Sequence, residues 1–62
     1  MRLLRRVEEF LKRSGMNATR FGREAVRDPR LVHDMRKGRE PRRNLTRRIE
    51  AFIARQDQGA GQ

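Results

Sequence analysis

The chain has 62 residues, 17 of them basic and eight acidic, and its formal net charge at pH 7 is +9. A chain of this length holds one small domain, which excludes an enzyme built from a catalytic and a substrate domain. It contains no cysteine, so disulfides and thiolate metal sites are excluded as well. The excess positive charge predicts a polyanionic partner, and only Lys12 and Lys37 of the basic residues are not arginine.

The first four residues, MRLL, look like the start of a signal sequence, but the apolar run ends at Arg5. No stretch approaches the apolar length of a signal peptide or a membrane span. We therefore expect a soluble cytoplasmic protein without a membrane partner.

The first predicted helix covers Arg2 to Arg13. Its apolar residues recur at helical spacing and form one stripe, namely Leu3, Leu4, Val7, Phe10 and Leu11. Glu8 and Glu9 each precede a basic residue by four positions, which predicts ion pairs with Lys12 and Arg13 along the helix surface. They are adjacent and point about 100° apart, so they do not form a catalytic carboxylate pair.

A second helix is predicted from Ala18 to Val26. Gly15 supplies a left-handed residue that ends the first helix, and Asn17 is a good N-cap for the second. Phe21 and Ala25 face inward. Gly22 lies in mid-helix, where glycine costs about 1 kcal/mol relative to alanine. We expect it there because a residue without a side chain lets a neighbouring helix backbone come close.

The third predicted helix, residues 29–37, has the clearest boundaries. Asp28 is an N-cap residue followed by Pro29, which suits the first helical position, and Gly38 ends the helix. Between them, residues 30–37 place Leu31, Val32 and Met35 on the apolar side.

A fourth helix follows the basic connector, residues 39–43. Asn44 or Glu40 is expected to cap it, and it should fade near Arg55. Its apolar stripe consists of Leu45, Ile49, Phe52 and Ile53. Small and polar residues predict a disordered tail over residues 56–62. The predicted fold is thus all-α, with a compact four-helix domain over residues 1–55 and this tail.

The second and third helices together predict a helix-turn-helix. An α-helix fits the major groove of duplex DNA, and the polar side of the third helix could enter it. That side carries Arg30, His33, Asp34 and Lys37, with Arg27 and Arg36 beside them. Arginine can bind guanine, and aspartate can accept a hydrogen bond from the cytosine amino group.

The spacing of Phe21–Gly22, Val32 and Gly38, with Pro41 following, resembles the lambda-repressor-like (Cro and XRE-type) helix-turn-helix family. The resemblance covers residues 7–53. Two positions depart from the pattern. Val26 stands where the family usually has glycine, which predicts a longer or differently bent turn, and Pro29 replaces a side chain that often reaches the bases.

The resemblance implies base contacts by Arg30, His33 and Asp34. It also implies phosphate contacts at the start of the second helix and in the turn and loop after the third, namely by Asn17, Ala18, Arg20, Lys37, Arg39, Arg42 and Arg43. We add Arg27 and Arg36, which lie beside the third helix, to the expected phosphate contacts. We expect no counterpart of the family's fifth helix, which is often part of a dimer contact, within these 62 residues. The protein would therefore bind DNA as a monomer or form a homodimer through another surface.

These observations predict a sequence-specific duplex-DNA-binding protein, a transcriptional regulator associated with the nucleoid. They predict no catalysis, no cofactor and no small-molecule substrate. A metal site is not expected, because His33 is the only histidine. Two alternatives stay open: an RNA-binding or ribosome-associated protein, and an adaptor whose basic surface meets an acidic protein.

Overall fold

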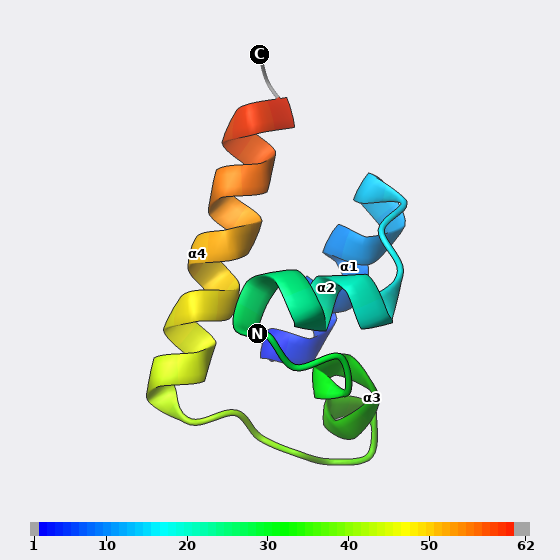
Figure 1. Ribbon diagram of the computed structural model, residues 1–62, viewed down its shortest axis with the longest axis vertical. Helices are drawn as coiled ribbons and strands as arrows, with labels where there is room; N and C mark the ends of the chain where they lie inside the picture. The colour runs from blue at the N-terminus through cyan, green and yellow to red at the C-terminus, as the bar shows by residue number, and fades with distance from the viewer. Residues whose placement is uncertain (1, 61–62) are drawn as a thin grey trace.

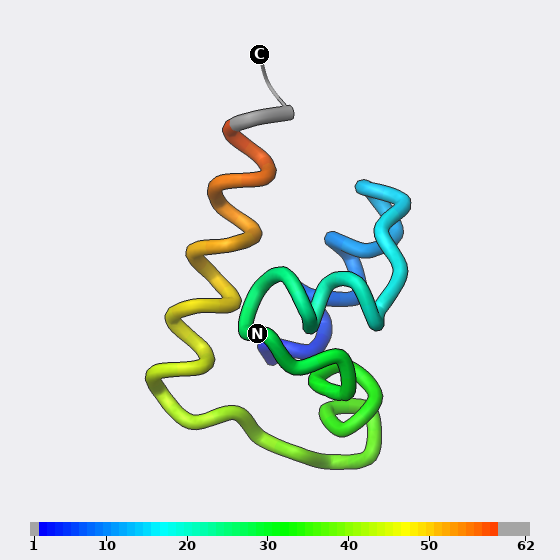
Figure 2. The backbone as a smooth tube through the Cα atoms, viewed as in Figure 1, coloured from blue at the N-terminus to red at the C-terminus, as the bar shows by residue number. Residues whose placement is uncertain are grey.

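The computed structural model describes residues 2–60, with side chains through residue 58. The chain forms four helices, α1 (Leu3–Ser14), α2 (Ala18–Val26), α3 (Leu31–Arg36) and α4 (Arg43–Ala60), as Figure 1 shows. The expected all-α, four-helix fold is confirmed. Both α3 and α4 pack against α1 and α2; in the view of Figure 1, α4 stands to the left of α2 and α3 lies below it. The connector after α3 sweeps across one end of the molecule to reach α4 (Figure 2).

The apolar stripes expected from the sequence form one core. Three phenylalanines from α1, α2 and α4 meet at its centre: the Phe21 ring centroid lies 5.6 Å from that of Phe10 and 5.4 Å from that of Phe52. These are tilted and edge-to-face contacts, which aromatic rings prefer. The buried apolar residues are Val7, Phe10, Leu11, Phe21, Ala25, Val26, Leu31, Val32, Met35, Ile49, Phe52 and Ile53.

Three predicted helix ends are confirmed. Gly15 ends α1 with φ +77°, and its N–H donates to the Leu11 carbonyl at 2.9 Å. The Asn17 side chain caps α2 by accepting from the Arg20 N–H at 2.8 Å. Gly38 has φ +111° after α3 and donates to the Met35 carbonyl at 3.1 Å. Glycine adopts such left-handed conformations without the steric penalty of a side chain.

Gly22 lies directly under the turn between α2 and α3. Its carbonyl accepts from the Asp28 N–H at 3.0 Å, and a Cβ placed on it would lie 2.2 Å from the Asp28 carbonyl oxygen. The backbone that comes close to Gly22 therefore belongs to this turn and not to a neighbouring helix, as had been expected. The helix α2 continues through the buried Val26. The residue that adopts the left-handed backbone conformation is therefore the next one, Arg27, with φ 59°. The turn is thus displaced by one residue from the glycine position of the lambda-repressor-like pattern.

The start of α3 was predicted too early. Asp28 holds a tight turn instead: its side chain accepts from the Arg30 N–H and its carbonyl accepts from the Leu31 N–H, both at 3.0 Å. The α-helix itself therefore begins at Leu31, with Arg30 at the N-cap position. Proline at residue 29 lies within the turn that leads into the helix.

Both ends of α4 also differ from the prediction. The helix begins at Arg43, so Asn44 lies inside its first turn and Glu40 is three residues upstream; neither is the capping residue. It continues past Arg55 to Ala60, so the first five residues of the expected tail are helical. Asp57 holds this extension, because both of its oxygens accept from the Arg13 guanidinium of α1 at 3.0 Å. Residues 61 and 62 lie outside the described part of the chain.

Ion pairs connect α1 to α3 and α4, whereas the two pairs predicted within α1 were wrong. Glu8 binds Arg36 of α3, and Glu9 pairs with Arg5. Arg13 binds Asp57 of α4, and its guanidinium carbon lies 5.5 Å from the centroid of the Phe10 ring of its own helix. Glu8 and Arg13 thus have partners on neighbouring helices, whereas Glu9 pairs within α1 but with the residue four positions before it. None of the helices described for residues 2–60 is long and apolar enough to cross a membrane.

Candidate nucleic-acid interface

One side of α3 is buried and the other is open to solvent. Leu31 and Val32 are fully buried, whereas Arg30 and His33 are exposed. The α3 face, as we call it below, comprises Arg30, His33, Asp34 and Lys37. The burial pattern follows from the helical spacing of the apolar residues, and it turns the predicted base-contacting residues away from the core.

The α3 face adjoins the first turn of α2. The His33 ring nitrogen Nε2 lies 3.4 Å from the Thr19 hydroxyl oxygen, and both side chains are exposed. This contact brings the predicted backbone-contacting start of α2 next to the predicted base-contacting helix. Thr19 itself was missed from the sequence, although it stands between two candidate residues, Ala18 and Arg20.

The candidates at the start of α2 differ in how far their side chains are available to bind phosphate. The Asn17 side chain is engaged as the helix cap. Ala18 is half-buried and packs against the core. The Arg20 Nε donates to Glu24 at 2.6 Å along the helix surface, in an exposed pair that solvent screens. Phosphate contact in this region would therefore come from the exposed outer side of the helix rather than from Ala18.

Arg39 joins the turn before α3 to the helix itself. Its Nη1 donates to Asp28 at 3.0 Å and to Asp34 at 3.3 Å. The hydrogen bond from Arg39 and that from the Arg30 N–H hold the pKa of Asp28 below its ordinary range, and the same Asp28 contact raises the pKa of Arg39. Two predicted contact residues, Asp34 and Arg39, are thus partners of each other in this structure.

Arg36 is directed towards α1. Its guanidinium donates twice to the Glu8 carboxylate, each time at 2.7 Å, in the fork geometry that favours arginine–carboxylate pairs. The hydrogen bond from Arg36 lowers the pKa of Glu8. Arg36, predicted to contact phosphate, therefore holds α3 against α1.

Five of the arginine and lysine candidates are exposed and stand in no ion pair among the described side chains. They are Arg27, Arg30, Lys37, Arg42 and Arg43. They come from consecutive segments: the turn before α3, the two ends of α3, and the junction of the connector with α4. No acidic residue lies in the first turn of α4. The helix dipole disfavours cations at this end and favours an anion such as phosphate.

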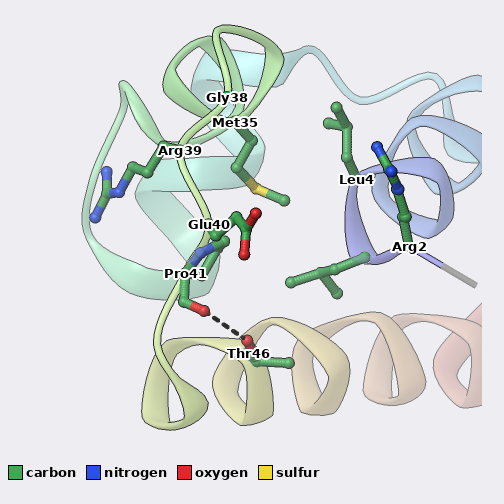
Figure 3. A pocket seen from close by; sticks show the side chains of 9 residues that line it. Arg2, Leu4, Met35, Gly38, Arg39, Glu40, Pro41 and Thr46 are labelled. Atoms are coloured by element: carbon green, nitrogen blue, oxygen red, sulfur yellow. Dashed lines mark hydrogen bonds between the residues drawn. The ribbon is translucent and has the colours of Figure 1, made fainter.

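An open pocket of about 430 Å³ lies behind the connector, between the start of α1, the end of α3 and the start of α4. Leu4 and Met35 point towards it, and the Thr46 hydroxyl donates to the Pro41 carbonyl at 3.3 Å beside it (Figure 3). Glu40 is the only carboxylate in its described lining. Its lining thus offers no pair of carboxylates for acid–base chemistry.

Comparisons with protein-family models, curated proteins and solved structures found no match for the chain. The resemblance to lambda-repressor-like domains therefore stays a prediction.

Proposed function

We propose that this protein is a sequence-specific duplex-DNA-binding protein, a transcriptional regulator that inserts the α3 face into the major groove. One observation carries the proposal: the solvent-exposed side of α3 adjoins the first turn of α2 through His33 and Thr19. A helix-turn-helix needs this juxtaposition, since one helix enters the groove while the preceding helix meets the backbone.

Within the proposal, Arg30 and His33 are the base-contacting residues. Both are exposed, and the Arg30 side chain stands outside the described ion pairs. Asp34 accepts from a cytosine amino group only if it shares its carboxylate with Arg39 or leaves that partner. Phosphate binding falls to the unpaired cations flanking α3, namely Arg27, Lys37, Arg42 and Arg43.

Single-stranded nucleic acid is the less suitable partner. Its binding sites commonly stack bases on exposed aromatic rings. The chain has no Tyr or Trp, and all three phenylalanines are buried. Structured RNA and an acidic protein remain the competing partners.

The salt dependence of duplex binding tests the proposal. Each phosphate contact contributes about −0.9 to the slope of log affinity against log salt, so four contacts predict a slope of about −3.6. Removing two of them with Arg42→Ala/Arg43→Ala should bring the slope to about −1.8. The measurement is a fluorescence-anisotropy titration of a labelled duplex at several salt concentrations.

The matched control is Arg5→Ala/Lys12→Ala, which removes the same charge from the exposed side of α1. It should leave the slope nearly unchanged. An equal loss of slope in both variants would show only a diffuse charge effect and would contradict the assigned interface. Affinity for a structured RNA equal to or greater than that for duplex DNA would contradict the choice of partner.

A further inference from the structure

Arg39 is fixed to α3 through both its backbone and its side chain. Its N–H donates to the Asp34 carbonyl at 2.9 Å, and its Nη1 donates to the carboxylates of Asp28 and Asp34 at 3.0 and 3.3 Å. We call these three side chains the Asp28–Arg39–Asp34 cluster. Figure 3 shows the Arg39 side chain directed away from the pocket behind the connector. The cluster thus joins the turn before α3, the helix and the connector.

This cluster is poorly suited to bind phosphate. A guanidinium Nη atom carries two hydrogens, and two carboxylates lie within hydrogen-bond distance of the same Nη1. A phosphate placed beside Arg39 would therefore be opposed by the negative charges of Asp28 and Asp34. Arg42 and Arg43, further along the chain, stand in no ion pair among the described side chains. Those two residues can bind phosphate without giving up a partner, whereas Arg39 cannot.

The two carboxylates of the cluster differ in what they leave free. Both oxygens of Asp28 are engaged, Oδ1 by the Arg30 N–H and Oδ2 by Arg39. Asp34 accepts from Arg39 through Oδ2, whereas its Oδ1 accepts no hydrogen bond from the side chains that the structure describes. Asp34 belongs to the α3 face, and its side chain is 38% exposed. One oxygen of Asp34 is thus held in place while the other is open to a donor outside the protein.

A free carboxylate oxygen on the α3 face distinguishes between two pyrimidines. Cytosine presents its amino group, a hydrogen-bond donor, in the major groove, whereas thymine presents the O4 oxygen, an acceptor that a carboxylate repels. A side chain that is already held in one rotamer also loses less conformational freedom on binding than a mobile one. Anchoring of Asp34 therefore favours recognition of cytosine.

We propose that Arg39 is a positioning residue, which anchors Asp34 through Oδ2 so that Oδ1 accepts a hydrogen bond from a cytosine amino group. Asp28 in turn holds Arg39 against the turn before α3. This inference rests on the proposed function, because it assigns one base contact of the α3 face. It replaces the phosphate contact that the sequence led us to expect for Arg39.

The test compares two duplexes that differ by one base pair. Selection from random DNA supplies the wild-type motif, and the position at which Asp34→Ala loses a preference for cytosine identifies the base pair. Affinities for the motif duplex and for one with thymine at that position are then measured by fluorescence anisotropy. The wild type should prefer cytosine by about 5-fold to 150-fold, the range of a good base contact. Arg39→Ala should reduce this preference to about threefold or less, with the preferences at other positions retained.

Further variants distinguish positioning from a general structural role. Because one nitrogen of Arg39 makes both contacts, an ammonium group can replace it, and Arg39→Lys should keep the preference for cytosine. Asp34→Ala/Arg39→Ala should lose no more of the preference than Asp34→Ala alone, since both residues act through one base contact. The matched control is Arg5→Ala, which removes another arginine paired with a carboxylate, that of Glu9 on α1, and should leave the preference unchanged.

The outcomes separate this inference from the proposed function. A wild-type motif in which no cytosine depends on Asp34 overturns the inference and leaves the proposed function intact. If Arg39→Ala weakens binding to both duplexes equally, Arg39 is a phosphate contact and the inference is wrong. A loss of preference at every position of the motif, not restored by Arg39→Lys, would show a displaced α3 and would also overturn it. A wild type that yields no motif overturns both proposals.

Discussion

The substitution Gly22→Ala tests the packing of the α2–α3 turn, on which the helix-turn-helix geometry depends. In an open helix, alanine would stabilise the protein by about 1 kcal/mol over glycine. Here the new Cβ would lie 2.2 Å from the Asp28 carbonyl oxygen and 3.2 Å from the Leu31 Cβ. The obstacle is backbone, so the turn itself must move.

The expected magnitude follows from the contacts that this movement disturbs. Overpacking costs about 1–3 kcal/mol. The Asp28 N–H bond to the Gly22 carbonyl and the Leu31 N–H bond to the Asp28 carbonyl, both 3.0 Å long, are worth about 1 kcal/mol each. With both bonds lost and the gain in helix propensity subtracted, the net loss is about 2–4 kcal/mol. For a domain of this size, each kcal/mol lowers Tm by about 4–8 °C.

The assay is thermal unfolding followed by circular dichroism at a helical wavelength, with Arg23→Ala as the control. Arg23 is the next residue of α2 and is exposed, so its removal should change stability by less than about 0.5 kcal/mol. A Gly22→Ala protein as stable as the wild type, or more stable, would refute the close approach of the turn.

Three further predictions concern other parts of the fold. Arg27→Gly should raise stability by up to about 1 kcal/mol in denaturant unfolding, because φ 59° is strained for arginine, yet duplex affinity should fall; equal or lower stability would contradict the strain. Glu8→Gln should lower Tm at pH 7 by an amount equivalent to about 0.2–1 kcal/mol. Since the pKa of Glu8 is below its ordinary 4.5, this difference should persist above pH 4.5 and vanish as the pH falls through the lowered value; a difference independent of pH would contradict the ion pair. Asn17→Ala should cost about 1 kcal/mol through loss of the cap, whereas Asn17→Asp should restore most of it; equal Tm values for the wild type and Asn17→Ala would show that the cap contributes nothing.

Local physical chemistry explains what could be predicted from the sequence. Helical spacing identified the buried residues, and Gly15, Asn17 and Gly38 marked helix ends because each satisfies a local backbone requirement. The predicted bounds of α2 agree with the structure. The close approach at Gly22 was also foreseeable, since glycine in mid-helix needs a reason.

The ion pairs could not be predicted in the same way. Glu8 has basic residues at helical spacing, yet it binds Arg36, 28 residues away, because α3 packs beside α1. Arg39 likewise binds Asp28 and Asp34 because the connector folds back over the turn. Such partners depend on tertiary geometry, and they decide which arginines of the candidate interface are free.

The proposed regulator function depends on sequence-specific recognition by α3, and a selection of bound duplexes from random DNA tests it most directly. We expect an enriched motif for the wild type, an altered motif for Arg30→Ala and His33→Ala, and the same motif with weaker binding for Arg42→Ala. A palindromic motif with half-sites about one helical turn apart would indicate a dimer on DNA. A wild-type selection that returns no enriched motif would contradict sequence-specific reading by α3.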